Sequence, residues 1–353
     1  MNLQPKLQKL ANKINGVQDL HLQVSDEANS EENIGFLILL LSLVGGLFAN
    51  AFFLAFLVLI GFFNNATAVL ILSLILLAIG LVFSKLNTSM VLQTILSTLV
   101  ISGTALFIYA LNNFGLDFKF CCLILSGLCI GFYFLFDDFI IRFLSVITFL
   151  NSFLYSLVLI IFKENSSEFA IMFGKFYLLI VLFGVFWILK NEEKWFANKT
   201  LNKLFQPTLS GMQLFVMLFM YVKMDNNTFG ISNMIHHLIL SGLFLYVLYD
   251  VLNTILNAPT KIKLGILIPF TIFIFTSIYQ PSMLISMLLI LLYFKHKEMI
   301  FLYFSILSLL VSIGLFYYDL SINLFNKSLL LMGGGLLFFI IYLVSKKLNV
   351  YEK

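Results

Sequence analysis

The sequence has few charges, few prolines and few cysteines. Only 11% of its 353 residues are charged, whereas about 25% are charged in an average soluble domain. This scarcity excludes an ordinary soluble protein, an intrinsically disordered chain and a basic nucleic-acid-binding domain. Five prolines exclude a collagen-like chain, and three cysteines are too few for a disulfide scaffold.

Apolar residues, by contrast, are abundant. They make up 61% of the chain, 41 residues are phenylalanine, and the mean hydropathy is +1.03. One globular core cannot bury so many apolar side chains, so most of them must face lipid or other helices. Uncharged runs of about 20 residues are typical of membrane-spanning helices, which satisfy their own backbone in lipid. The sequence therefore predicts an all-α protein, a polytopic bundle of transmembrane helices.

About twelve spans, or ten to twelve with the alternatives below, are predicted from apolar runs that end at charged or turn-forming clusters. The predicted spans are 34–63, 66–84, 90–111, 120–136, 139–162, 176–189, 208–224, 233–257, 264–279, 282–294, 299–318 and 328–345. The first run is long enough to bend near Gly45-Gly46 or to split near Asn50. The two spans around Pro281 could instead be one kinked helix or a re-entrant pair.

The polar residues at the two ends, and the basic residues between spans, predict the orientation. Segments 1–33 and 346–353 are predicted to be polar tails that flank a transmembrane domain at 34–345. With an inner amino terminus, twelve spans place sixteen of the 21 Lys and Arg residues in inner segments and five in outer ones. Because short cytoplasmic loops carry an excess of Lys and Arg, this asymmetry predicts that both termini lie in the cytoplasm.

One predicted span, 233–257, contains an acidic residue among apolar ones. Its polar residues are spaced i, i+4, i+7 and i+11: Tyr246, Asp250, Asn253 and Asn257. This spacing places them on one helical face. Ionisable residues within spans are costly unless paired, so the stripe is a candidate intramembrane polar site for an ion or a lipid head group. The alternative is a helix end that emerges into the cytoplasmic interface, with the carboxylate already in water.

Arg142, the single arginine, belongs to the same candidate site. It lies near the cytoplasmic end of the predicted span 139–162, at a depth comparable with Asp250. A salt bridge between the two helices is one hypothesis. The preferred alternative is a local i, i+4 pair with Asp138, because that pair needs no tertiary coincidence.

The remaining reactive side chains predict no catalytic residue, cofactor or metal. His236 and His237 stand at the outer start of a span and, as neighbours, point about 100° apart on a helix, so one metal ion cannot easily take both. They are interpreted as interfacial histidines, although a membrane acyltransferase would use such a histidine as its general base. The cysteines fit no zinc or redox motif and are interpreted as inert buried thiols. They are Cys121, Cys122 and Cys129.

The carboxy-terminal third carries residues that resemble a known family. They run from Pro281 through the basic turn Lys295 to Lys297, then Tyr317-Tyr318-Asp319-Leu320, Leu324 and Lys327-Ser328. With them the chain resembles an uncharacterised family of bacterial polytopic membrane proteins, domain-of-unknown-function family 4401, which is related to the family found beside GDYxxLxY-motif proteins. The resemblance implies a multi-pass protein of the inner (cytoplasmic) membrane. It also implies a small membrane-anchored GDYxxLxY-motif protein as a candidate partner, and no established activity.

Part of this region forms a candidate interfacial motif: Tyr317, Tyr318, Asp319, Lys327 and Ser328. Aromatic rings are typical of head-group depth, and Lys327 can neutralise Asp319 or reach a lipid phosphate. We interpret the motif as an interfacial anchor rather than as a catalytic site.

Two functions from different classes are consistent with these features. The first is a non-enzymatic membrane component that assembles with another envelope protein, because buried charge is scarce and the loops are too short for a substrate domain. The second is a transporter or flippase of a lipid-like or small polar substrate, suggested by the number of spans and by the Asp250 stripe. A lipid-linked sugar polymerase or acyltransferase ranks lowest because the predicted outer loops are short, and no nucleic-acid partner is expected.

Overall fold

The computed structural model describes residues 45–46, 48–85, 90–162, 167–221, 231–254 and 280–319, together with isolated positions between 267 and 277 and between 325 and 339. All regular structure in these residues is helical, as the composition predicted. The helices are α2 (Ala66–Ser84), α3 (Met90–Asn113), α4 (Phe118–Leu135), α5 (Phe139–Phe162), α6 (Ser167–Lys190), α7 (Glu192–Ala197), α8 (Lys199–Phe219), α9 (Ile231–Thr254), α11 (Pro281–His296) and α12 (Met299–Asp319), with a short 3-10 helix, η1 (Phe62–Asn64).

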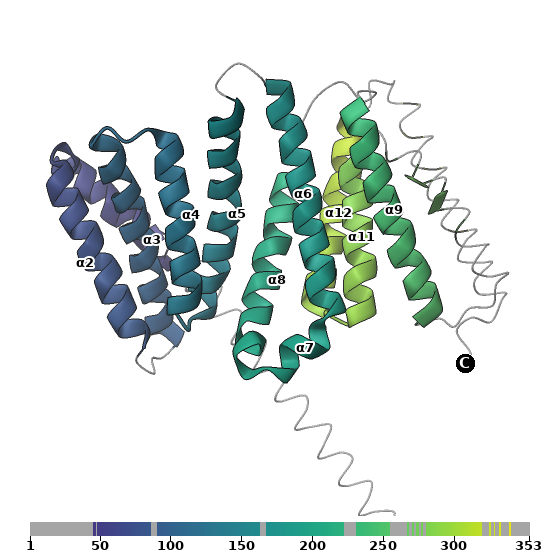
Figure 1. Cartoon of the computed structure of the whole chain (residues 1–353), viewed down its shortest axis with the longest axis horizontal. Coiled ribbons are helices and arrows are strands. Elements are labelled where there is room, and N and C mark those ends of the chain that lie inside the picture. The colour runs from purple at the N-terminus through teal and green to yellow at the C-terminus, as the bar shows by residue number, and fades with distance from the viewer. Residues whose placement is uncertain are drawn as a thin grey trace, which may run out of the picture. The chain divides into compact units, whose positions relative to one another are not determined.

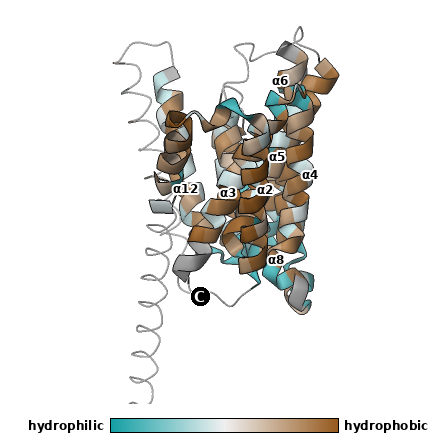
Figure 2. Ribbon diagram, turned by 90° about the vertical axis from the view of Figure 1, so that its left-hand side faces the viewer, coloured by the Kyte–Doolittle hydropathy of each residue, from teal (hydrophilic) through white to brown (hydrophobic). Residues whose placement is uncertain are grey.

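Seven of the described helices are long and apolar enough to cross a membrane. They are α2, α3 from Ile95, α4, α5, α6 from Phe169, α9 from Asn233 and α12 up to Tyr318. Two apolar helices, Phe48–Leu59 and Pro281–His296, are shorter. Figure 2 shows apolar residues, in brown, along the lengths of the spanning helices. The chain is therefore a polytopic helical membrane protein, while the predicted spans 264–279 and 328–345 lie outside the described residues except at isolated positions.

Turn-forming residues begin two helices where the sequence predicted a break. Asn65 caps α2, because its Oδ1 accepts hydrogen bonds from the backbone N–H groups of Thr67 and Ala68 at 3.1 and 3.2 Å. Asparagine is among the best residues for this role. Pro281 stands in the first turn of α11, where its missing N–H costs no helical hydrogen bond. The helix on the carboxyl side of Pro281 is therefore a separate element that starts at the proline.

Two helices begin earlier than predicted. Helix α6 starts at Ser167 instead of residue 176, so Lys175 lies inside the helix and not in a loop. Helix α8 starts at Lys199 instead of residue 208 and continues through Pro207. Proline removes one backbone donor from a helix, but tertiary packing can compensate for that loss, and Leu204, Phe205 and Leu209 beside it are buried.

The chain is divided into two compact units. Unit 1 contains the described residues up to Ile161 together with Gln206–Gly211 of α8. Unit 2 contains Phe162–Phe205 and the described residues from Met212 onward.

In unit 1, helices α2, α3, α4 and α5 lie side by side (Figure 1). Leu77 of α2 packs with Val100 of α3 and with Phe132 and Phe136 at the end of α4. Helices α2 and α3 approach closely at Gly80, where a Cβ atom would lie 2.5 Å from Val100 Cγ2. Small residues of this kind let transmembrane helices pack backbone to side chain, which replaces the missing hydrophobic drive in lipid.

In unit 2, contacts between side chains show the relative directions of the helices. Lys175 bonds Asn233 in the first half of α6 and α9, and Phe186 packs on Tyr246 in the second half, so these helices run parallel. Asp250 and Lys295 pair near the ends of α9 and α11, which are therefore also parallel. Helix α12 returns beside α11 after a tight turn at Lys297, whose φ of 59° lies in the left-handed region.

We predict that alanine at Gly80 destabilises the protein by about 1–3 kcal/mol, the usual cost of overpacking. The new methyl group would meet Cγ2 of Val100, a β-branched residue whose χ1 angle is restricted in a helix. Gly127→Ala on α4 is the matched control, because nothing lies within 4 Å of a Cβ there. The thermal midpoint in mild detergent, measured by size-exclusion chromatography after heating, should fall for Gly80→Ala alone. Equal midpoints for the two variants would contradict the close α2–α3 contact.

Candidate functional site

Arg142 is buried in the first turn of α5, with 6% of its surface exposed. Its Nη2 pairs with Asp137 Oδ1 at 2.9 Å, and its Nε donates to the Tyr133 carbonyl at 3.3 Å. The preferred pair with Asp138 is therefore wrong by one residue. Asp250, the partner in the alternative hypothesis, forms an ion pair with Lys295 within its own unit.

Asp138 is not the partner of Arg142 because its carboxylate serves the helix instead. Its Oδ1 accepts the backbone N–H of Ile140 at 3.2 Å at the start of α5, as a helix-capping side chain does. Its Oδ2 is buried without a hydrogen bond. Burial raises the pKa of the Asp138 carboxyl, and the Ile140 N–H and the charge of Arg142 lower it only in part.

The predicted stripe lies in the second half of α9, and its fourth member, Asn257, lies outside the described residues. Asp250 forms an ion pair with Lys295 in the last turn of α11. Tyr246 is half-exposed and packs edge-to-face on Phe186 of α6, while Asn253 is half-buried. The carboxylate thus has a cation in place within the protein.

A hydrogen bond between helices involves the residue that follows Lys295. His296 Nδ1 is 2.8 Å from Glu192 Oε2 on the short helix α7, which lies between two predicted spans. Adjacent residues at the end of α11 therefore bind α9 and α7. These contacts fix the basic turn at Lys295–Lys297 to the rest of unit 2.

Unit 2 contains a polar seam that was not predicted from the sequence. We call it the hydroxyl seam, and its members are Gln213 and Tyr221 on and just after α8, Ser286 on α11, and Ser305, Ser308 and Ser312 on α12. The serines of α12 are spaced i, i+3 and i+7, one helical face. This spacing in the sequence indicates a polar face on α12, but it does not indicate which helices carry the hydrogen-bonding partners.

The hydroxyl seam joins three helices by hydrogen bonds. Gln213 Nε2 donates to the Phe301 carbonyl at 3.1 Å and to Ser305 Oγ at 3.3 Å. Further along, Tyr221 OH donates to the Ser308 carbonyl at 2.7 Å, and the hydroxyls of Ser308 and Ser286 are 3.0 Å apart. From Ser305 to Ser312 the seam extends about 10 Å along the helix axis. Polar bonds of this kind hold transmembrane helices together, and Gln213 Oε1 remains buried without a partner.

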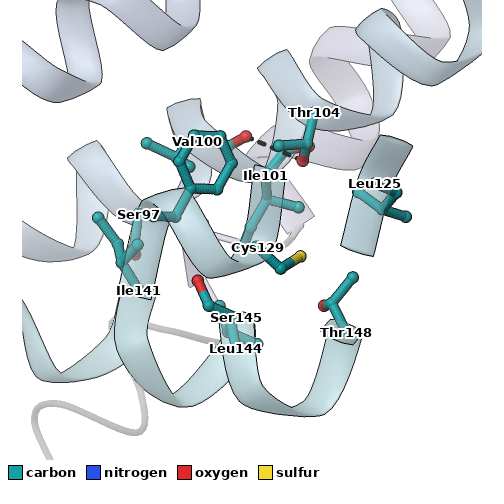
Figure 3. Close-up of a pocket in the computed structure, with 11 residues that line it drawn as sticks. Ser97, Val100, Ile101, Thr104, Leu125, Cys129, Ile141, Leu144, Ser145 and Thr148 are labelled. Carbon is teal, nitrogen blue, oxygen red and sulfur yellow. Dashed lines mark hydrogen bonds between the residues drawn. The ribbon is translucent and has the colours of Figure 1, made fainter. Parts of the chain in front are cut away.

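Unit 1 contains a small cavity between α3, α4 and α5 (Figure 3). Its volume is about 50 Å³, and polar groups of Ser97, Ser145, Thr148 and Cys129 line it among apolar side chains. This volume suffices for a small number of water molecules and not for a drug-sized ligand. Cys129 and its two companions are free and buried, as predicted.

The candidate interfacial motif is described only in part. Tyr317 and Tyr318 form the end of α12, with their ring centroids 5.8 Å apart and Tyr318 80% exposed. Ser328 Oγ donates to the Phe325 carbonyl at 2.7 Å. The side chains of Asp319 and Lys327 lie outside the described residues, so their pairing remains a prediction.

The two histidines are not surface residues of the bundle. His236 and His237 are 4% and 8% exposed, because neighbouring elements cover both rings. His237 Nε2 lies 3.0 Å from the Ile274 carbonyl. Among the residues that the structure describes, no three His, Cys, Asp or Glu side chains gather where they could hold a metal ion.

Replacement by asparagine should lower the stability of the protein at Asp137 but not at the adjacent Asp138. Asp137→Asn leaves the buried Arg142 without its carboxylate and should lower stability by about 1–2 kcal/mol. Asp138→Asn keeps the capping oxygen and removes a buried charge, so stability near pH 7 should be equal or higher. Because the folded pKa of Asp138 lies above its unfolded value, its contribution favours folding at low pH and is lost as the pH rises through the folded pKa.

Thermal midpoints of the two variants between pH 4 and pH 8 check both statements. The ionisation of Asp138 should lower the thermal midpoint as the pH rises. This fall should be absent from Asp138→Asn and present in Asp137→Asn. A lower midpoint for Asp138→Asn than for Asp137→Asn at pH 7 would contradict the assignment of the two carboxylates.

The ion pairs predict which substitutions interact. Asp250→Asn and Lys295→Gln should be non-additive, with a coupling of about 0.5–1 kcal/mol, because the pair is partly exposed. Asp250→Asn and Arg142→Gln should be additive, because these charges have separate partners. Midpoints of the single and double variants measure both couplings, and the reverse pattern would restore the pair between Arg142 and Asp250.

Comparison with known proteins places the chain in a family without assigning an activity. No curated protein and no solved structure matches it. A family described as a domain of unknown function, DUF4401, matches residues 36–348, which include every helix described above. The resemblance carried by the carboxy-terminal third is therefore confirmed, and this multi-pass chain belongs to the DUF4401 family.

Proposed function

We propose that the protein is a non-enzymatic component of the bacterial inner membrane that assembles with another envelope protein through its helix faces. The observation that supports this is the position of Asn151. It lies at the middle of α5, is exposed, and donates its Nδ2 to the Ile147 carbonyl of its own helix at 2.8 Å. Tyr155, one turn further, is 49% exposed.

An exposed amide at the centre of a span is unfavourable in lipid and favourable in a contact between helices. The bond to Ile147 does not bind α5 to any other helix, so it gives the amide no role in packing. A partner helix that hydrogen-bonds Asn151 and packs beside Tyr155 would give it one. The partner that the family resemblance implies is a small membrane-anchored GDYxxLxY-motif protein.

The proposal includes the finer topology. Twelve spans at 34–345, with cytoplasmic tails at 1–33 and 346–353, place both termini inside. The helix directions in unit 2 support this arrangement, because parallel α6 and α9 require a return crossing between them and parallel α9 and α11 require another. The predicted spans 208–224 and 264–279 would supply these crossings.

Transport of a small polar substrate is the second candidate. The hydroxyl seam favours it, because uncharged donors and acceptors follow one another along the interior of unit 2 and Gln213 Oε1 has unused hydrogen-bonding capacity. Solute entry into vesicles that contain the purified protein, abolished by Gln213→Leu, would favour transport over assembly.

Asn151→Leu should reduce the recovery of a membrane partner at least tenfold when the tagged protein is purified in mild detergent and its companions are quantified by mass spectrometry. Asn191→Leu is the matched control, because Asn191 bonds the carbonyl four residues back, at 2.9 Å, but at the end of α6. Asn151→Leu should have the same elution volume in size-exclusion chromatography and the same melting midpoint as the unmodified protein. Absence of a stoichiometric partner, or a lower melting midpoint for Asn151→Leu, would count against the proposal.

A further inference from the structure

Three polar side chains lie on neighbouring parts of α6 and α9, in the first half of each helix. Lys175 lies eight residues after Ser167, where α6 begins. Its Nζ donates to Asn233 Oδ1 near the start of α9. His236 follows Asn233 by three residues and so lies on the same helical face, and it interacts electrostatically with Lys175.

His236 brings to this cluster a ring nitrogen, Nε2, that has no hydrogen-bonding partner. The residue is 4% exposed, and its Nε2 is buried without a hydrogen bond. The neighbouring His237 does not belong to the cluster, because its ring bonds the Ile274 carbonyl about 100° away around the helix. Lys175 and Asn233 are half-buried, so the cluster opens toward the surface at these two residues and ends inside at His236.

The surface beside the cluster is apolar and exposed. Phe169 and Met172 precede Lys175 on α6, with exposed fractions of 59% and 38%. Ile180 and Phe183, which follow Lys175 along α6, are 66% and 45% exposed. A ligand bound at this cluster would therefore contact the Lys175 ammonium and the His236 imidazole at one end and lipid-facing side chains at the other.

We propose that Lys175, Asn233 and His236 form a binding site for the phosphate group of a membrane phospholipid. The lysine ammonium supplies charge-assisted hydrogen bonds to phosphate oxygens, and the Nε2–H tautomer of His236 supplies another. Asn233 positions the ammonium. The lysine stem can extend its ammonium toward head-group depth. The acyl chains lie along the exposed apolar side chains that follow Lys175 on α6, Ile180 and Phe183.

The test is lipid binding by the purified full-length protein in mild detergent. Phosphatidylglycerol is titrated, and the bound lipid is counted by native mass spectrometry while the melting midpoint is recorded. Diacylglycerol, which has the same chains without phosphate, and inorganic phosphate are titrated separately. Phosphatidylglycerol should bind and raise the midpoint, and neither of the other two should. Lys175→Met and His236→Gln should each weaken binding at least fivefold, while Lys175→Arg should retain it.

Lys190→Met is the matched control, because Lys190 lies at the opposite end of α6 and is exposed. It should bind phosphatidylglycerol as the unmodified protein does. Unchanged binding by both Lys175→Met and His236→Gln would overturn the proposal, as would equal stabilisation by diacylglycerol. Stabilisation by inorganic phosphate alone would overturn the lipid assignment. The site is independent of the Asn151 surface, so failure of one leaves the other intact.

Discussion

A polar group inside a bilayer has no water to bond, so the protein must supply its partner. This constraint explains where the polar side chains of the chain lie. Arg142 is buried, and a carboxylate and a backbone carbonyl receive its donors. The serines of α12 bond to α8 and α11 instead of facing lipid. In a protein whose helices gain no hydrophobic energy by leaving lipid, such bonds and close contacts at glycine decide which helices are neighbours.

Charges follow the same constraint at the helix ends. The pair of Asp250 and Lys295 and the pair of His296 and Glu192 both include the last turn of α11. Lysine and histidine are favourable there because the helix dipole is negative at its carboxyl end. Asp250 thus has a cationic partner within unit 2, whereas we propose Lys175, toward the other end of that unit, as part of a phospholipid site.

The sequence predicted elements better than contacts. Apolar runs bounded by Asn65 and by residue 139 gave α2 and α5 their predicted bounds, because turn chemistry and hydropathy are local properties. The start of α6 was missed because a lysine was treated as the end of a span, although its long side chain can bond across to Asn233. Asp137 was missed as the partner of Arg142, because the capping role of Asp138 depends on the geometry of the turn. The hydroxyl seam was missed because serine spacing on α12 does not disclose what α8 and α11 bring to it.

We propose that the helices cross the membrane in alternation, with the basic ends inside. Single cysteines at Lys85, Gly115 and Lys297, in a chain whose three native cysteines are replaced by alanine, test this topology through a membrane-impermeant maleimide. We expect labelling of Gly115→Cys on intact cells, and labelling of Lys85→Cys and Lys297→Cys only after permeabilisation. Labelling of Lys297→Cys from outside would contradict the alternation, because it would require a different number of crossings between α4 and α12.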